Sequence, residues 1–292
     1  MKLYWEPDQL NEYFVRVIRD TLLGNLPHAS AVSECDAILY PYNAKATTAA
    51  RTRLARYALA ARKAKRPLIA FAVVDSVSAI AVPGTIVFRT SMDRSKSRHN
   101  EFLLPYLWET YDRQVEYKVR DWDPEPTIGF CGLADDRRRP WLDRLSHDMR
   151  CNFIVRPAFW GGNPHDPQLI REFFTNIMDT DMTFAMRGYG NFSMRFYQVM
   201  SCGRVPIWVD TDSVLPYEGL EEIPWSRISI RLEAGAYSTA RAAIHHFWDS
   251  VGDFGALQDD IRSLHERLFT PGAFARHLTT HWDSYLARAH RT

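Results

Sequence analysis

Apolar residues in the first part of the chain form short continuous runs, separated by segments with a different spacing. The runs at residues 37–40, 67–74 and 85–88 are rich in Ile, Leu, Val, Ala and Phe. Continuous apolar runs of this length are typical of strands that are buried on both faces. Over residues 47–65, Ala and Leu recur at helical spacing. The pattern therefore predicts a mostly parallel sheet with covering helices.

The same alternation restarts after residue 126 and predicts a second unit. Apolar runs predict strands, and amphipathic segments predict helices between them; the strands fall at residues 127–132, 152–155, 182–186, 205–209 and 228–230. An acidic segment with two prolines, DWDPEP at 121–126, predicts the linker. A last helix is expected to begin with Thr270 as its cap and Pro271 as its first residue.

These elements predict an α/β fold with two Rossmann-like domains facing a cleft, followed by a C-terminal helix. We place the first domain at residues 1–122 and the second at 123–292. A cleft between two such units is a common place for a ligand in this fold class.

Composition and charge exclude several classes of protein. The net charge is +1, whereas a nucleic-acid binder normally carries a basic surplus. The basic residues of segment 51–65 are best explained as a solvated helix face; contact with anionic lipid or glycan is the alternative. The beginning of the chain does not resemble a signal peptide, and no apolar run approaches the ~18 residues of a membrane span. We expect a cytoplasmic protein that contacts membranes peripherally, if at all.

The segment from Arg187 to Glu218 carries the candidate chemistry. Gly188 and Gly190 permit a tight turn, and a helix is expected to begin at Ser193. The N–H groups of a helix start lack internal partners, and such a start commonly holds phosphate oxygens. Arg187 and Arg195 flank this start with forked donors that suit a diphosphate. Asp210 and Asp212 follow the next strand and are expected at the same edge of the sheet.

Two classes of enzyme fit this arrangement. A dinucleotide oxidoreductase has a similar Gly-x-Gly-x-x-Ser pattern, with an acid about 20 residues on, where Asp210 stands. That pattern normally follows the first strand of its unit, whereas here it follows the third. The other class is a nucleotide-sugar transferase, in which the same elements hold a leaving diphosphate.

The segment resembles the exostosin family of inverting glycosyltransferases, which adopt the two-lobed GT-B type of fold. The matching positions are Arg187, Gly188, Gly190, Ser193, Arg195, Gly203, Pro206, Ile207, Asp212, Leu215, Pro216 and Trp225. Residues 128–132, which end in Gly132, together with Arg137–Arg139, are similar to the strand and loop that open the family's donor domain. Where the family has Glu on the helix after Arg195, this chain has Gln198, which offers a hydrogen bond without a charge.

The resemblance implies transfer of a sugar, with inversion, from a nucleotide-sugar to an oligosaccharide or glycolipid. A UDP-sugar is the favoured donor. The donor-binding set would be Arg187, Gly188, Gly190, Ser193, Gln198, Asp210, Asp212 and Gly132. Arg195 would stabilise the leaving group, and Glu101 would be the general base, with Asp75 as its rival.

The resemblance implies no cofactor. Asp210 and Asp212 match a manganese-binding Asp-x-Asp pattern, but the paired α/β units favour a mechanism without metal. Because of Gln198, an inactive glycan-binding relative remains an alternative.

Overall fold

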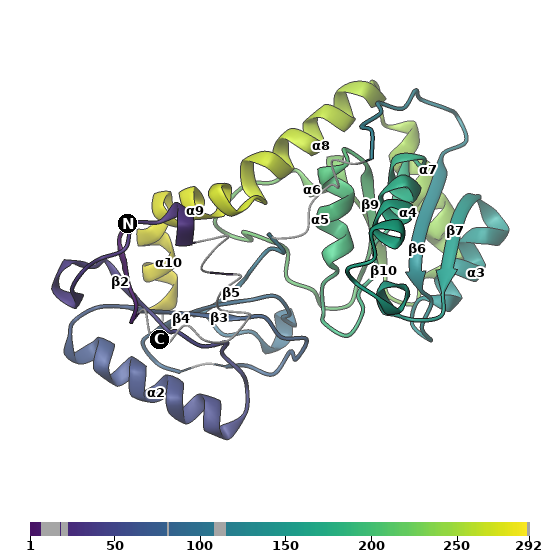
Figure 1. Ribbon diagram of the computed structural model, residues 1–292. Helices are drawn as coiled ribbons and strands as arrows, with labels where there is room; N and C mark the ends of the chain where they lie inside the picture. Colours follow the sequence, from purple (N-terminus) through teal and green to yellow (C-terminus); the bar gives the residue numbers. More distant parts are fainter. Residues whose placement is uncertain (7–17, 19–22, 81, 108–114, 291–292) are drawn as a thin grey trace.

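The computed structural model describes residues 1–6, 18, 23–80, 82–107 and 115–290. Two lobes are visible in Figure 1, each built on its own five-stranded sheet. All strand pairs within these two sheets are parallel. The prediction of two parallel-sheet α/β domains with C-terminal helices is therefore confirmed.

The first sheet has its strands in chain order. They are β1 (Leu3–Tyr4), β2 (Ala37–Leu39), β3 (Leu68–Ala72), β4 (Thr85–Arg89) and β5 (Glu101–Leu103). Every residue of β3 and β4 is buried, as the continuous apolar runs predict. Helix α2 (Thr48–Lys63) begins after Thr47, whose side chain accepts a hydrogen bond from the Ala50 N–H. Strand β5 was not among the strands predicted from the sequence.

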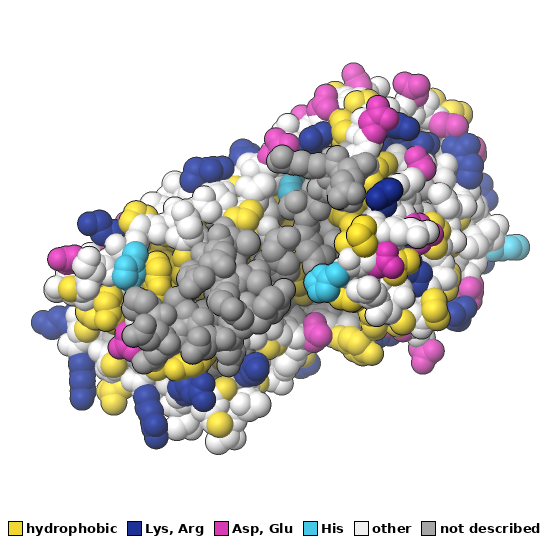
Figure 2. Space-filling view, in the orientation of Figure 1, with side chains coloured by type: hydrophobic (Ala, Val, Ile, Leu, Met, Phe, Trp, Pro, Cys, Tyr) yellow, Lys and Arg dark blue, Asp and Glu magenta, His cyan; other side chains and the backbone are white. Residues whose placement is uncertain are grey.

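The basic residues of α2 face solvent. Arg51, Arg53, Arg56, Arg62 and Lys63 are all exposed, and Figure 2 shows Lys and Arg side chains along this edge of the first lobe. In the described part of the chain, no helix combines the length and the apolar character that crossing a bilayer requires.

The second sheet has a strand order that differs from the chain order. Its strands are β6 (Thr127–Leu133), β7 (Arg150–Arg156), β8 (Met182–Phe184), β9 (Val205–Asp210) and β10 (Ile230–Glu233). They lie in the order β10-β9-β8-β6-β7. The chain therefore moves outward from β6 to β7 and then returns to the other side of β6. The carboxyl ends of β6 and β8 form a topological switch point, where open α/β sheets bind ligands.

Helices connect these strands and continue beyond them. They are α3 (Arg139–Asp148), α4 (Pro167–Met178), α5 (Met194–Ser201), α6 (Trp225–Ile228), α7 (Ala240–Asp249) and α8 (Phe254–Leu268). Gly203 follows α5 with a left-handed φ of 64°, as expected for a helix end. Pro206 is the second residue of β9, an interior strand, where the start of the strand tolerates a missing donor. Residue Ile228 ends α6, so the last strand starts later than predicted.

The C-terminal segment returns to the first lobe (Figure 1). It forms two helices, α9 (Pro271–Thr280) and α10 (Trp282–Ala289), instead of the single helix expected. Thr270 caps α9 by accepting from the Ala273 N–H, as predicted. Phe274 packs edge-on against Phe88 of β4 at 5.4 Å, and Tyr285 packs against Phe102 of β5 at 4.8 Å between ring centroids. The terminal helices thus cover the first sheet, whereas the sequence grouped them with the second domain.

Candidate functional site

A cavity of about 740 Å³ opens at the switch point of the second sheet. Its wall includes the end of β6, the glycine loop after β8 and the first turn of α5. The first lobe contributes Asp75, which follows β3 at the carboxyl edge of the first sheet. Both sheets therefore present their carboxyl edges to one space, the arrangement that places ligands in this fold class.

Arg195 lies across the carboxyl ends of β6 and β8. Its guanidinium donates to the Cys131 carbonyl at 2.7 Å and to the Phe184 carbonyl at 3.4 Å. The group also lies over the Phe130 ring, 4.4 Å from its centroid. A Cβ atom at Gly132 would come within 2.6 Å of Arg195 Nη2. Glycine at position 132 therefore allows this arginine to reach the switch point.

The charge of Arg195 has no compensating carboxylate among the described residues. Burial lowers the pKa of Arg195 to about 9, and the positive charge of Arg138 adds to the effect. In the described part of the structure, Arg195 forms no ion pair and its Nε has no hydrogen-bond acceptor. A guanidinium stays protonated at neutral pH, so this lowered pKa marks a cation whose environment favours an anionic ligand.

Two further arginines raise the positive charge of the cavity wall. Arg138 and Arg156 both line the cavity, and both are buried. Arg138 is held in place by the main-chain carbonyls of Leu133, at 2.9 Å, and Arg187, at 3.2 Å. Among the described residues that line the cavity, Asp75 is the one carboxylate. Arg156 is paired with Glu172, which compensates its charge. Arg138 and Arg195 form no ion pair among the described residues and outnumber the one carboxylate of the lining, which favours an anionic ligand.

Helix α5 directs its first turn at the same space. Ser193 precedes the helix with an extended backbone, and its hydroxyl makes no capping bond to the helix. The side chains of Ser193, Arg195 and Gln198 line the cavity from the first two turns. The hydroxyl and the first-turn N–H groups can therefore donate to phosphate oxygens, which the positive helix end also favours.

The two loop glycines permit close approach rather than a left-handed turn. Neither Gly188 nor Gly190 has a positive φ. A Cβ atom at Gly190 would lie 2.9 Å from Asp75 Oδ1 in the other lobe. A Cβ atom at Gly188 would lie 3.2 Å from Arg138 Nη2. The chain bends at residues 189–192 without a left-handed glycine, and Gly190 lets this loop approach the first lobe closely.

Arg187 holds this loop instead of lining the cavity. Its Nη1 donates to Asn191 Oδ1 at 2.7 Å, and its Nη2 donates to the Tyr189 carbonyl at 3.0 Å. Asn191 is fully buried and also donates to Asp93 Oδ1 of the first lobe at 2.6 Å. The sequence analysis did not single out Asn191, although it lies inside the segment that carried the resemblance.

Asp210 and Asp212 lie outside the described cavity lining. Asp210 pairs with Arg231 at 2.7 Å. Asp212 has a left-handed φ of 66° and accepts from the Ser95 N–H at 3.1 Å, which joins the two lobes. The two aspartates do not join Arg195 in the cavity lining, because Asp210 ends β9 and Asp212 follows it, and β9 lies beyond β8 and away from the switch point.

Glu101 also lies away from the cavity, in the interior of the first lobe. Its carboxylate is paired with buried Arg89 at 2.9 Å and accepts from the Ile80 N–H at 2.6 Å. Arg89 in turn donates to the Ser76 carbonyl at 2.6 Å, next to Asp75. Glu101 thus holds Arg89, which contacts the segment next to Asp75, whereas Asp75 itself is exposed at the cavity.

The sequence analysis missed Asn191 and Arg156, and it named Arg138 only as part of a loop. The sequence did point to the region of Arg138, since this residue lies in the loop that resembles the start of the family's donor domain. Arg156 ends strand β7 and donates to the Leu169 carbonyl at 2.8 Å, a contact that sequence spacing does not reveal.

Comparison of the sequence with protein-family models gives no match, and comparison with curated proteins gives none. The fold is similar to solved structures of several proteins. They include HepE of Anabaena in complex with UDP-glucose, with 10% identity, 97% of this chain and 100% of that chain covered, and a TM-score of 0.47. A glycosyltransferase of Rickettsia africae has 10% identity, coverage of 97% and 89%, and a TM-score of 0.43. Sucrose-phosphate synthase of Thermosynechococcus elongatus has 10% identity, coverage of 98% and 98%, and a TM-score of 0.46.

Proposed function

We propose that this protein is a glycosyltransferase that moves a sugar from a nucleoside-diphosphate sugar to a hydroxyl of a glycan acceptor. The observation that carries the proposal is Arg195, a guanidinium that forms no ion pair with any described residue, beside a helix start at the switch point. This arrangement offers donors and positive charge to a diphosphate. The sequence resemblance to exostosin-type enzymes supports inversion and favours a UDP-sugar.

In the proposed reaction, the acceptor oxygen attacks the anomeric carbon of the donor from the first lobe. The bond between that carbon and the phosphate oxygen breaks, and the diphosphate leaves with the electron pair. Arg195, the Ser193 hydroxyl and the first-turn amides of α5 stabilise the negative charge that grows on the phosphate. Since these groups supply positive charge, the reaction is proposed to proceed without a metal at the diphosphate.

Asp75 is the proposed general base, in place of Glu101. It lines the cavity from the lobe opposite the diphosphate donors, and its position beside Gly190 puts it at the mouth of the glycine loop. From there it can take the proton that the acceptor hydroxyl loses as it attacks. Gln198 is buried in the cavity wall, where it is proposed to bond a ribose hydroxyl of the donor.

The test is binding and transfer by the full chain with a chelator present. UDP or another nucleoside diphosphate should raise the melting temperature, whereas NAD(H) should not. Arg195→Ala should lower the transfer rate by about 10²–10³-fold. Arg241→Ala, at an exposed position of α7, is the matched control and should leave the rate unchanged.

Asp75→Asn separates the role of the general base from the role of the groups that bind the diphosphate. It should lower the rate by about 10²–10⁴-fold while nucleotide binding stays intact, because the general base is distant from the diphosphate. The proposed function would be refuted if Arg195→Ala transferred sugar at the wild-type rate. A rise in melting temperature with NAD(H) and with no nucleoside diphosphate would also refute it, and would favour the oxidoreductase hypothesis.

A further inference from the structure

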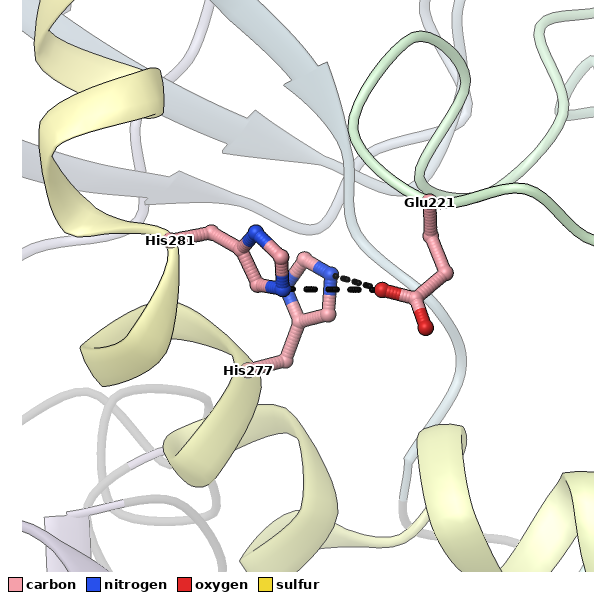
Figure 3. Close-up of side chains that lie close together, drawn as sticks. All are labelled: Glu221, His277 and His281. Atoms are coloured by element: carbon pink, nitrogen blue, oxygen red, sulfur yellow. Dashed lines mark ion pairs between the residues drawn. The ribbon is translucent and has the colours of Figure 1, made fainter.

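A cluster of side chains that can bind a metal lies where the terminal helices meet a loop of the second lobe. Figure 3 shows Glu221, His277 and His281 with their polar ends directed at one another. His277 belongs to α9 and His281 follows its last turn, so the two rings are four residues apart on one helical face. Glu221 comes from the loop between β9 and α6, in the second lobe.

The spacing of the three polar atoms fits one metal ion. Glu221 Oε2 lies 3.4 Å from His277 Nε2 and 3.5 Å from His281 Nε2. The three ligand atoms all lie within 4.8 Å of one another. Zinc bonds to nitrogen and oxygen are about 2.0–2.1 Å long, which gives a tetrahedral edge of about 3.3–3.4 Å. The two separations between Glu221 and the imidazole nitrogens are therefore close to those around a tetrahedral ion.

His277 directs a buried nitrogen into this space. Its side chain is 3% exposed, and Nε2 lies at ion-pair distance, 3.4 Å, from Glu221 Oε2 but makes no hydrogen bond of good geometry among the described residues. Its other nitrogen, Nδ1, lies 3.2 Å from the Tyr285 hydroxyl. With Nδ1–H donating to that hydroxyl, Nε2 presents a lone pair toward Glu221 and His281.

The surrounding groups hold the ligands in this orientation. Arg267 donates to Glu221 Oε1 at 3.2 Å, which leaves Oε2 for the ion. The His277 ring stacks on the His281 ring, with 4.3 Å between centroids, and contacts the Tyr217 ring, with 4.1 Å between centroids. Metal-binding histidines and carboxylates commonly have outer partners of this kind, which fix their orientation.

We propose that Glu221, His277 and His281 bind one zinc-class divalent ion through Oε2 and two Nε2 atoms. Two imidazoles and a carboxylate suit zinc, whereas magnesium prefers oxygen ligands throughout. The side chains of His281 and Glu221 are 30% and 20% exposed, so water can reach a fourth position.

The ion would fasten the two lobes to each other. Glu221 is in a loop of the second lobe, and α9 packs against the first lobe through Phe274 and Phe88. Neither histidine nor Glu221 is among the described residues of the cavity. The proposed ion site is thus separate from the proposed transfer chemistry.

The test is zinc titration of the full chain after treatment with a chelator and its removal. Calorimetry should show about one equivalent bound, and zinc should raise the melting temperature where magnesium does not. His281→Gln and Glu221→Gln should each weaken zinc binding by at least about 100-fold. His246→Gln, at an exposed position of α7, is the matched control and should bind zinc as the wild type does.

A cobalt titration gives an independent readout, since tetrahedral Co²⁺ absorbs visible light strongly. The wild type should show these bands and His281→Gln should not; circular dichroism checks that the variant is folded. The proposal is overturned if the wild type takes up no more zinc than His281→Gln, or if His246→Gln loses as much affinity. Nucleoside-diphosphate binding is measured in parallel, so failure of the zinc site does not bear on the proposed transfer.

Discussion

Asn191 offers the sharpest test of how the two lobes are joined around the cavity. Its amide nitrogen donates to Asp93 Oδ1 at 2.6 Å and to the Thr211 carbonyl at 3.0 Å. Its amide oxygen accepts from Arg187 Nη1 at 2.7 Å. The side chain has no exposed surface. One buried amide therefore connects the first lobe, the loop after β9 and the arginine of the glycine loop.

The cost of Asn191→Ala follows from these contacts. A primary amide can make four good hydrogen bonds, each with a net contribution of about 0.5–1.5 kcal/mol. The polar groups left behind would lose a partner: Asp93 is buried, and Arg187 is partly buried. We expect a loss of about 4 kcal/mol in the free energy of unfolding. For a chain of this size, that corresponds to a fall of about 10 °C in melting temperature.

The assay is urea unfolding of the wild type, Asn191→Ala and Asn152→Ala, followed by circular dichroism. Asn152 is an exposed strand residue, and only its main-chain carbonyl accepts a side-chain hydrogen bond among the described residues. Its replacement should therefore change the free energy of unfolding by less than about 0.5 kcal/mol. Asn191→Ala should also weaken nucleoside-diphosphate binding, because Arg187 no longer holds the glycine loop. A destabilisation of Asn191→Ala below about 1 kcal/mol would show that the network is not a joint between the lobes.

Two further predictions concern buried ionisable groups. Glu101→Gln should reduce the free energy of unfolding by about 3 kcal/mol, because buried Arg89 loses its partner. If the variant instead keeps the urea midpoint of the wild type and transfers sugar about 100-fold more slowly, Glu101 and not Asp75 would be the general base. Burial lowers the pKa of His265 to about 4, below its unfolded value of about 6.5. The unfolded chain therefore takes up a proton first, and stability is lost as the pH falls from about 6.5 to about 4, by at most about 3 kcal/mol from this residue. Urea midpoints at pH 7 and 4.5 should fall less in His265→Gln than in the wild type, and equal falls would contradict the assignment.

The sequence predicted the elements of the sheets well, for a physical reason. Strands such as β3 and β4 are buried on both faces, so their residues form continuous apolar runs that stand out from the helices. Short strands carry less signal. Strand β5 contains Glu101, whose charge is neutralised by Arg89 from the neighbouring strand, a contact that is not visible in local sequence.

The cavity was predicted only in part. Gly132, Ser193, Arg195 and Gln198 lie where a strand end and a helix start meet, and local motifs reveal such places. The placement of Asp210 and Asp212 depended on the order of strands in the sheet, which the sequence does not specify. The separation of Glu101 from Asp75 depended on which carboxylate found a buried partner, a property of tertiary packing.

The return of the terminal helices to the first sheet has a consequence for biosynthesis. Phe88 and Phe102 are covered by Phe274 and Tyr285, so residues far apart along the chain complete one hydrophobic core. A polypeptide leaves the ribosome from its amino end, and many domains fold as they emerge. Here the aromatic face of the amino-terminal lobe lacks its cover until translation has passed residue 285. The order of synthesis therefore delays the folding of the amino-terminal lobe, although this lobe is made first. The carboxyl-terminal lobe can fold before it.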